Sequence, residues 1–120
     1  MNEEAKKWMK KAEDDFENAE ILLRNKKYDG AMFFSQQAAE KALKAISIEK
    51  FNRLRKIHDL VELGKDVNLD KNLLENAKEL TMAYIYSRYP DAEEIKDLKK
   101  LSENLAEYSR RIVEWVKKSL

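Results

Sequence analysis

The chain has 120 residues, of which 39% are charged, yet its formal net charge is only +1. This length predicts one helical domain over residues 1–120, large enough to bury a core without metal or disulfide staples. The chain has no cysteine and one histidine, which excludes disulfides, a thiol nucleophile and a histidine-rich metal site. We expect neither a metal nor a cofactor. No apolar run approaches the length of a signal peptide core or a membrane span, so we expect a cytoplasmic protein with no membrane contact.

The first half of the chain predicts two long helices. From Glu3 to about Asn25, apolar residues recur at steps of three and four, which indicates one face of an amphipathic helix. A second helix is predicted from about Tyr28 to Glu49. Its small side chains would let the backbone of a neighbouring helix come close. The expected buried stripe of this helix is Ala31, Phe34, Ser35, Ala38, Ala42, Ala45 and Ile46.

A basic loop and a short helix are expected next. The segment from Lys50 to Ile57 has no clear apolar period, which indicates a loop. It is dense in positive charge: Lys50, Arg53, Arg55 and Lys56. A short helix is predicted from Asp59 to Gly64, with the glycine at its end.

Two further long helices complete the predicted fold. Asp70 is expected to cap the first of them, which should end before Pro90 because a proline disfavours a helical residue ahead of it. Asp91, with Glu94 three residues later, forms a capping-box pattern for a last helix that runs nearly to the C-terminus. With no alternating strand pattern, the chain is predicted to be all-α: an antiparallel up-and-down bundle of four long helices plus one short helix. We expect seven large side chains to be buried: Trp8, Phe16, Phe34, Leu43, Leu80, Leu105 and Ile112.

Three stretches of the chain resemble landmarks of the HEPN domain, the helical module named from higher eukaryotes and prokaryotes nucleotide-binding. They are Phe34–Ala45, Ile57–Leu60 and Ser87–Asp91. The resemblance covers nearly the whole chain and implies the same helical fold and a homodimer. It also implies a nucleotide- or RNA-binding component of a two-gene module with a minimal nucleotidyltransferase, in which the two proteins often act as toxin and antitoxin.

The candidate nucleotide- or RNA-binding site lies in two irregular segments. We expect His58, Arg88, Tyr89 and Asp91 to line a cleft, with Arg53 and Arg55 at its rim. Imidazole exchanges protons near neutral pH, and arginine holds phosphate. An alternative is that each segment is a separate turn, with His58 capping the short helix or hydrogen-bonding across the bundle. The polar face Gln36, Gln37, Glu40 and Lys41 could likewise contact a base and phosphate, or be buried between subunits or ion-paired in solvent.

Two alternative functions remain open. Active HEPN ribonucleases carry an arginine, four to six residues and then a histidine, and Arg53 and His58 have this spacing. Arg88 has the place that the resemblance assigns to this arginine, but Glu93, Glu94 and Ile95 follow where the histidine is expected. A metal-independent ribonuclease that uses His58 with Arg53 or Arg88 is therefore one alternative, and no catalytic residue is assigned. The other is a dimeric helical scaffold without catalysis.

Overall fold

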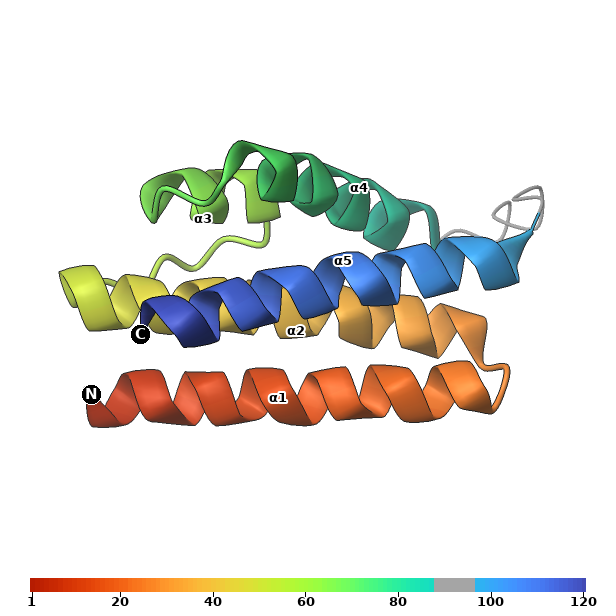
Figure 1. The fold of residues 1–120 in the computed structure, drawn as a ribbon, viewed down its shortest axis with the longest axis horizontal. Helices are drawn as coiled ribbons and strands as arrows, with labels where there is room; N and C mark the ends of the chain where they lie inside the picture. Colours follow the sequence, from red (N-terminus) through yellow and green to blue (C-terminus); the bar gives the residue numbers. More distant parts are fainter. Residues whose placement is uncertain (88–96) are drawn as a thin grey trace.

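The computed structural model describes residues 1–87 and 97–120, and these residues form a bundle of helices (Figure 1). The helices are α1 (Glu3–Arg24), α2 (Tyr28–Phe51), α3 (Leu60–Asp66), α4 (Lys71–Ser87) and α5 (Leu98–Ser119). α1 and α2 form an antiparallel pair, and α4 and α5 form another (Figure 1). The described residues contain no strand. The predicted all-α, up-and-down bundle of four long helices and one short helix is confirmed.

Short polar side chains start three of the helices. The Oδ1 of Asn2 accepts hydrogen bonds from the backbone amides of Glu4 and Ala5 at the start of α1. Asp59 does the same for α3, and Asp97 accepts from the amide of Lys100 at the start of α5. Each carboxylate or amide oxygen satisfies backbone N–H groups that have no partner inside the helix.

Three helix boundaries differ from those predicted. α2 continues past Glu49 to Phe51, so Lys50 lies in the helix and not in the loop. α3 continues past Gly64 to Asp66. The glycine is needed inside the helix, because a Cβ at this position would lie 2.9 Å from the side chains of both Leu69 and Leu74. α5 begins at Leu98, after Asp97, whose backbone is left-handed with a φ of 67°. The predicted caps Asp91 and Glu94, together with Pro90, lie outside the described residues.

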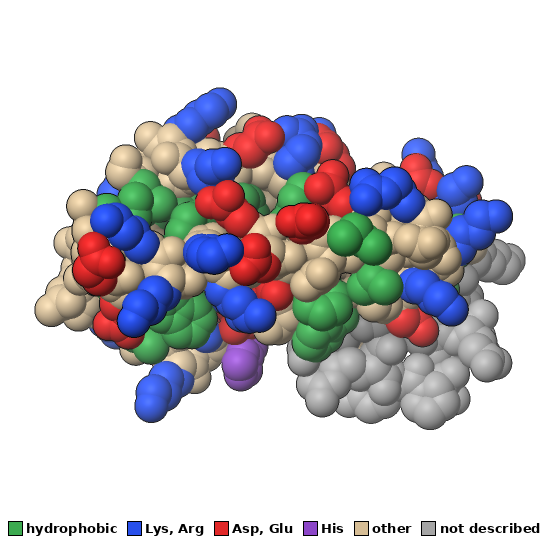
Figure 2. All heavy atoms as spheres, turned by 90° about the horizontal axis from the view of Figure 1, so that it is seen from below, with side chains coloured by type: hydrophobic (Ala, Val, Ile, Leu, Met, Phe, Trp, Pro, Cys, Tyr) green, Lys and Arg blue, Asp and Glu red, His purple; other side chains and the backbone are tan. Residues whose placement is uncertain are grey.

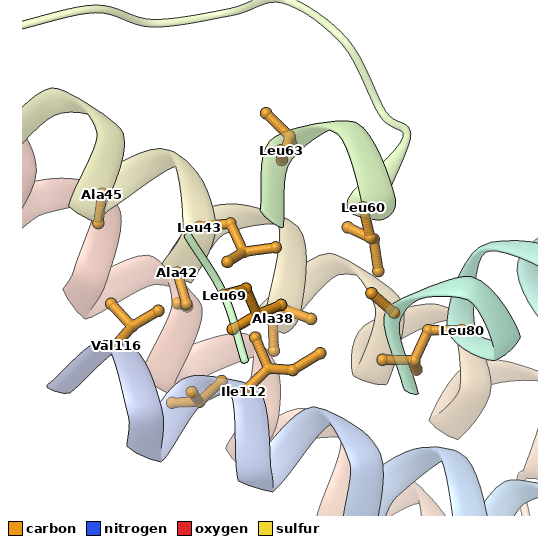
Figure 3. Packing of buried hydrophobic residues seen from close by; sticks show 14 of the residues in the cluster. Ala38, Ala42, Leu43, Ala45, Leu60, Leu63, Leu69, Leu80, Ile112 and Val116 are labelled. Atoms are coloured by element: carbon orange, nitrogen blue, oxygen red, sulfur yellow. The ribbon is translucent and has the colours of Figure 1, made fainter. Parts of the chain in front are cut away.

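α2 is the central element of the bundle. It packs against α1, α3, α4 and α5, whereas α1 makes no comparable contact with α3 or α4. Ala38, Ala42 and Ala45 are fully buried along it. In Figure 3, leucines of α3 and α4 and the α5 residues Ile112 and Val116 lie around these alanines. The predicted small-residue stripe therefore lets several helices approach one helix closely.

The predicted core was right for the aliphatic residues and wrong for the aromatic ones. Leu43, Leu80, Leu105 and Ile112 are at most 1% exposed. Trp8, Phe16 and Phe34 are only half-buried, and of these Trp8 and Phe16 pack against the core. The alanine-lined contacts of α2 bring the backbones too close to leave room for large rings.

Two serine hydroxyls are buried in the bundle without a partner. The Oγ atoms of Ser35 in α2 and Ser109 in α5 form no hydrogen bond within the described part of the chain. Ser102 is equally buried, but its Oγ donates to the carbonyl oxygen of Leu98 at 2.8 Å. Burying a hydroxyl without a hydrogen bond opposes folding.

We expect Ser35→Ala and Ser109→Ala each to raise the free energy of unfolding by about 1 kcal/mol, because each removes an unsatisfied hydroxyl and favours the helix. Ser102→Ala is the control, since it gains the same helix propensity but loses a hydrogen bond. Urea unfolding followed by circular dichroism measures all three. Equal effects of the three substitutions would show that Ser35 and Ser109 have hydrogen-bond partners in solution.

Candidate functional site

A buried ion pair on α2 forms the base of the candidate site. The Oε2 of Glu40 accepts a hydrogen bond from the Nζ of Lys44 at 3.0 Å, and both residues are at most 5% exposed. The Nε2 of Gln36 donates to the Oε1 of Glu40 at 3.2 Å. The ammonium of Lys44 also lies 5.6 Å from the ring centroid of Trp8, within the range of a cation–π interaction. Glu40 is thus a buried carboxylate whose charge is compensated inside the chain.

His58 forms a hydrogen bond with this carboxylate from the solvent-exposed side. Its Nδ1 lies 3.1 Å and 3.2 Å from the two carboxylate oxygens of Glu40. An ionised carboxylate can only accept hydrogen bonds, so the proton of a neutral His58 must reside on Nδ1. The His58 side chain is nevertheless 77% exposed, and the single histidine stands out at the edge of the molecule in Figure 2. Its Nε2 edge is therefore presented to solvent at a fixed position.

The chain between α2 and α3 explains this position. α2 ends at Phe51, and its C-cap residue Asn52 has a left-handed backbone with a φ of 50°. From there the chain doubles back over α2 before α3 begins (Figure 1). Ser47 Oγ donates to the carbonyl oxygen of Arg53 at 3.0 Å and fixes the first part of the return. His58 therefore lies over the middle of α2 and not at the end of the bundle.

The two arginines predicted for the rim differ in their surroundings. Arg55 donates through Nη1 to both carboxylate oxygens of Asp66 in α3, at 3.1 Å and 2.8 Å. This hydrogen bonding raises the pKa of Arg55 above its usual range. Arg53 is exposed, and its guanidinium forms no ion pair with any described residue. Arg53 is therefore available to a ligand, whereas Arg55 mainly joins the loop to α3.

The polar side chains of α2 are ion-paired or hydrogen-bonded, as one alternative expected, but most of them are buried within the chain and not solvated. Gln36 and Glu40 are buried, and the Nε2 of Gln37 donates to the Oε1 of Gln36 at 2.7 Å. Lys41 pairs with Asp15 of α1, which is 1% exposed. These side chains are occupied with one another, so Gln36 and Glu40 are not exposed to read a base. Sequence reasoning missed Glu40 as the partner of His58, although Gln36, Glu40 and Lys44 recur at the four-residue spacing of one helix face.

The remaining predicted site residues, Arg88, Tyr89 and Asp91, lie outside the described residues. The cleft that they were expected to form with His58 stays a prediction. What the structure brings together is an anchored imidazole and the basic loop that leads to it. Lys50, Arg53 and Lys56 are exposed in or beside this loop and make no ion pair with a described side chain. Such a group can hold phosphate by charge and exchange a proton at the imidazole.

Residues 1–87 and 97–120 hold no cluster of three or more histidine, aspartate or glutamate side chains arranged to bind a metal ion. Over the same ranges, the structure has no helix with the length and apolar character needed to cross a membrane.

We expect Glu40→Ala to lower the free energy of unfolding by about 3–5 kcal/mol, because it leaves the Lys44 ammonium buried without its counter-charge. His58→Ala should cost less than about 1 kcal/mol, since the His58 side chain is largely exposed and water can replace its hydrogen bond to Glu40. Chemical denaturation measures both. The double variant Glu40→Met/Lys44→Met should recover most of the loss, and a loss equal to that of Glu40→Ala would show that the carboxylate itself, not the unpaired charge, is required.

Comparison with known proteins gives a consistent result. The sequence profile of the HEPN domain matches residues 5–119. The fold is similar to that of TT1696 from Thermus thermophilus, with a TM-score of 0.84 and 29% sequence identity over 97% of this chain and 98% of that chain. It is also similar to ST0689, an archaeal HEPN homologue, with a TM-score of 0.78 and 29% identity over 96% of each chain.

A shorter match is to a Methanocaldococcus jannaschii protein named "Putative toxin MJ1304". The two are 46% identical over 44 residues, which span 37% of this chain and only 29% of that protein.

Proposed function

Because the chain belongs to the HEPN domain family, we propose that it binds RNA or a nucleotide through His58 and the basic loop before it. We further propose that it acts in a toxin–antitoxin-like pair with a minimal nucleotidyltransferase. The toxin name of the relative from Methanocaldococcus jannaschii supports the second part. That match spans less than a third of the relative, so it supports the class of function and no residue-level role.

One observation carries the binding proposal: His58 is 77% exposed yet held at Nδ1 by a buried carboxylate. A freely rotating surface histidine would lose conformational entropy on binding, whereas an anchored one is already oriented. Of the three cations that precede His58 in the loop, Arg55 pairs with Asp66, whereas Arg53 and Lys56 have no acidic partner among the described residues. Charges without partners are available to phosphate oxygens, and the site therefore suits a phosphate-bearing ligand.

A homodimer forms part of the same proposal. Met82 and Ile85 are 45% and 50% exposed and lie three residues apart on α4. Residues at this spacing are neighbours on one helix face. Exposed apolar side chains that adjoin one another favour association. A second copy of the chain is the partner that the family resemblance leads us to expect there.

Ribonuclease activity is the second candidate function, and the hydrogen bond between His58 and Glu40 favours it. A carboxylate that orients an imidazole is a common arrangement for general acid–base catalysis. Arg53 lies five positions earlier and could stabilise the charge that develops on a phosphate. Against this, the histidine expected after Arg88 is replaced by Glu93, Glu94 and Ile95. Binding without efficient cleavage is therefore the preferred form of the proposal.

We expect His58→Ala and Arg53→Ala each to weaken binding of a labelled single-stranded RNA by about three- to tenfold. Loss of a phosphate contact at Arg53 should also make the plot of log binding constant against log salt concentration less steep, by about one unit of slope. Fluorescence anisotropy at several salt concentrations measures both effects, with ATP as a competing ligand. Arg24→Ala is the matched control, because it removes the same charge from the opposite end of α1 and α2 (Figure 1). Equal affinities for all variants would contradict the proposed site.

We expect the purified protein to leave a bound RNA intact over the period in which binding reaches equilibrium. Gel electrophoresis of end-labelled RNA, in buffer with a metal chelator, measures cleavage. If RNA is hydrolysed efficiently and His58→Ala abolishes the activity without reducing binding, the ribonuclease alternative replaces the preferred proposal. Hydrolysis that survives in His58→Ala would point to a contaminating nuclease.

A further inference from the structure

A groove between α1 and α5 lies apart from His58 and the basic loop. Two adjoining hollows of about 420 Å³ and 320 Å³ form it, and both are lined by Phe16, Glu20 and Arg110. α1 and α5 each pack mainly against α2 and meet each other much less. The half-buried ring of Phe16 and the side chains of Leu23 and Val113 give the groove an apolar lining.

Acidic side chains dominate the polar lining of this groove. Six glutamates line the two hollows, against three cations. Two of these cations are already engaged: Arg110 pairs with Glu107 and Glu114, and Lys117 lies 3.9 Å from Glu13. The hydrogen bond from Arg110 lowers the pKa of Glu107, so this carboxylate is ionised at neutral pH.

Three of the glutamates have no such compensation. Glu17, Glu20 and Glu103 form no hydrogen bond or ion pair with any residue in ranges 1–87 and 97–120. Glu17 and Glu20 stand on α1, and Glu103 stands on α5, so unpaired carboxylates flank the apolar lining from both helices. A ligand that complements this groove must be apolar along its centre and positively charged on both flanks.

The length of the groove indicates the form of that ligand. The lining extends from Glu13 to Arg24 along α1 and from Glu103 to Lys117 along α5. At the rise of an α-helix these spans correspond to about 17 and 21 Å, or about 11–14 helical residues. A helix that presents an apolar stripe between rows of lysine or arginine would fill a groove of this length and charge.

We propose that the α1–α5 groove docks a basic amphipathic helix of a partner protein. RNA is a poor occupant, since its phosphates would face uncompensated carboxylates. The proposal is independent of the RNA-binding proposal, because the two surfaces share no residue. The molecule would thus bind a phosphate-bearing ligand at the basic loop and a cationic protein segment at the groove.

The test uses a synthetic helical peptide of about 14 residues, with leucine at every third or fourth position between lysines, as the probe. Fluorescence anisotropy measures its binding to the full chain. Glu17→Gln/Glu20→Gln should weaken binding by about five- to tenfold, because two rim charge pairs are lost. Glu62→Gln/Glu75→Gln removes two exposed carboxylates from α3 and α4 and is the matched control, which should bind as the wild type does.

Several results would overturn the proposal. These are equal loss in both double variants, the absence of saturable binding, or amide chemical-shift changes centred outside α1 and α5. If the wild type is a dimer and Glu17→Gln/Glu20→Gln turns it into a monomer, the groove holds a second copy, and the partner helix is excluded. RNA binding measured on the same variants should not change. The peptide and RNA measurements therefore test the two proposals independently of each other.

Discussion

The burial of α2 on nearly all sides is the constraint on which the rest of the structure depends. A helix enclosed by four others is usually apolar around its whole circumference, yet α2 carries Glu40 and Lys44 at positions that are at most 5% exposed. An isolated charge at such a position would be very costly, so each must be compensated within the chain. The pairing of Glu40 with Lys44 one turn away meets this requirement. The pairing of Lys41 with Asp15 of α1 meets it again at the neighbouring interface.

This constraint also places the candidate site. Glu40 has two oxygens and cannot leave the core, so it offers a fixed acceptor at the point where the returning loop passes. His58 binds there, and Arg55 binds Asp66 a few residues earlier in the same loop. With the hydrogen bond from Ser47 to the Arg53 carbonyl oxygen, the loop is thus held at three points, while the side chains of Arg53 and Lys56 remain exposed. The buried Glu40 that compensates Lys44 in the core therefore also positions His58 at the surface.

The fold was largely predictable from the sequence because apolar periodicity and small residues report directly on helix packing. The stripe of Ala38, Ala42 and Ala45 indicated close helix contacts, and these residues are fully buried. The burial of whole aromatic rings was not predictable, since periodicity gives the face on which Phe16 or Phe34 lies but not the room available there. Gly64 appeared to end a helix because a sequence does not show which side chains, here Leu69 and Leu74, press against a backbone.

The candidate site was less predictable: His58 was identified from its chemistry, but its partner Glu40 was not, because a glutamate among other charged residues usually points to solvent.

The arrangement of helices around α2 also bears on the order in which the chain can fold. α1 and α2 are adjacent in sequence and make the most extensive helix–helix contact in the described residues, so this hairpin can form as soon as both helices have left the ribosome. The face of α2 that receives Ile112 and Val116 must then wait for α5, which follows the other described helices in the chain. Until α5 arrives, an apolar surface remains open on a largely formed hairpin, and it is during this interval that the nascent chain is most exposed to aggregation or to capture by a chaperone.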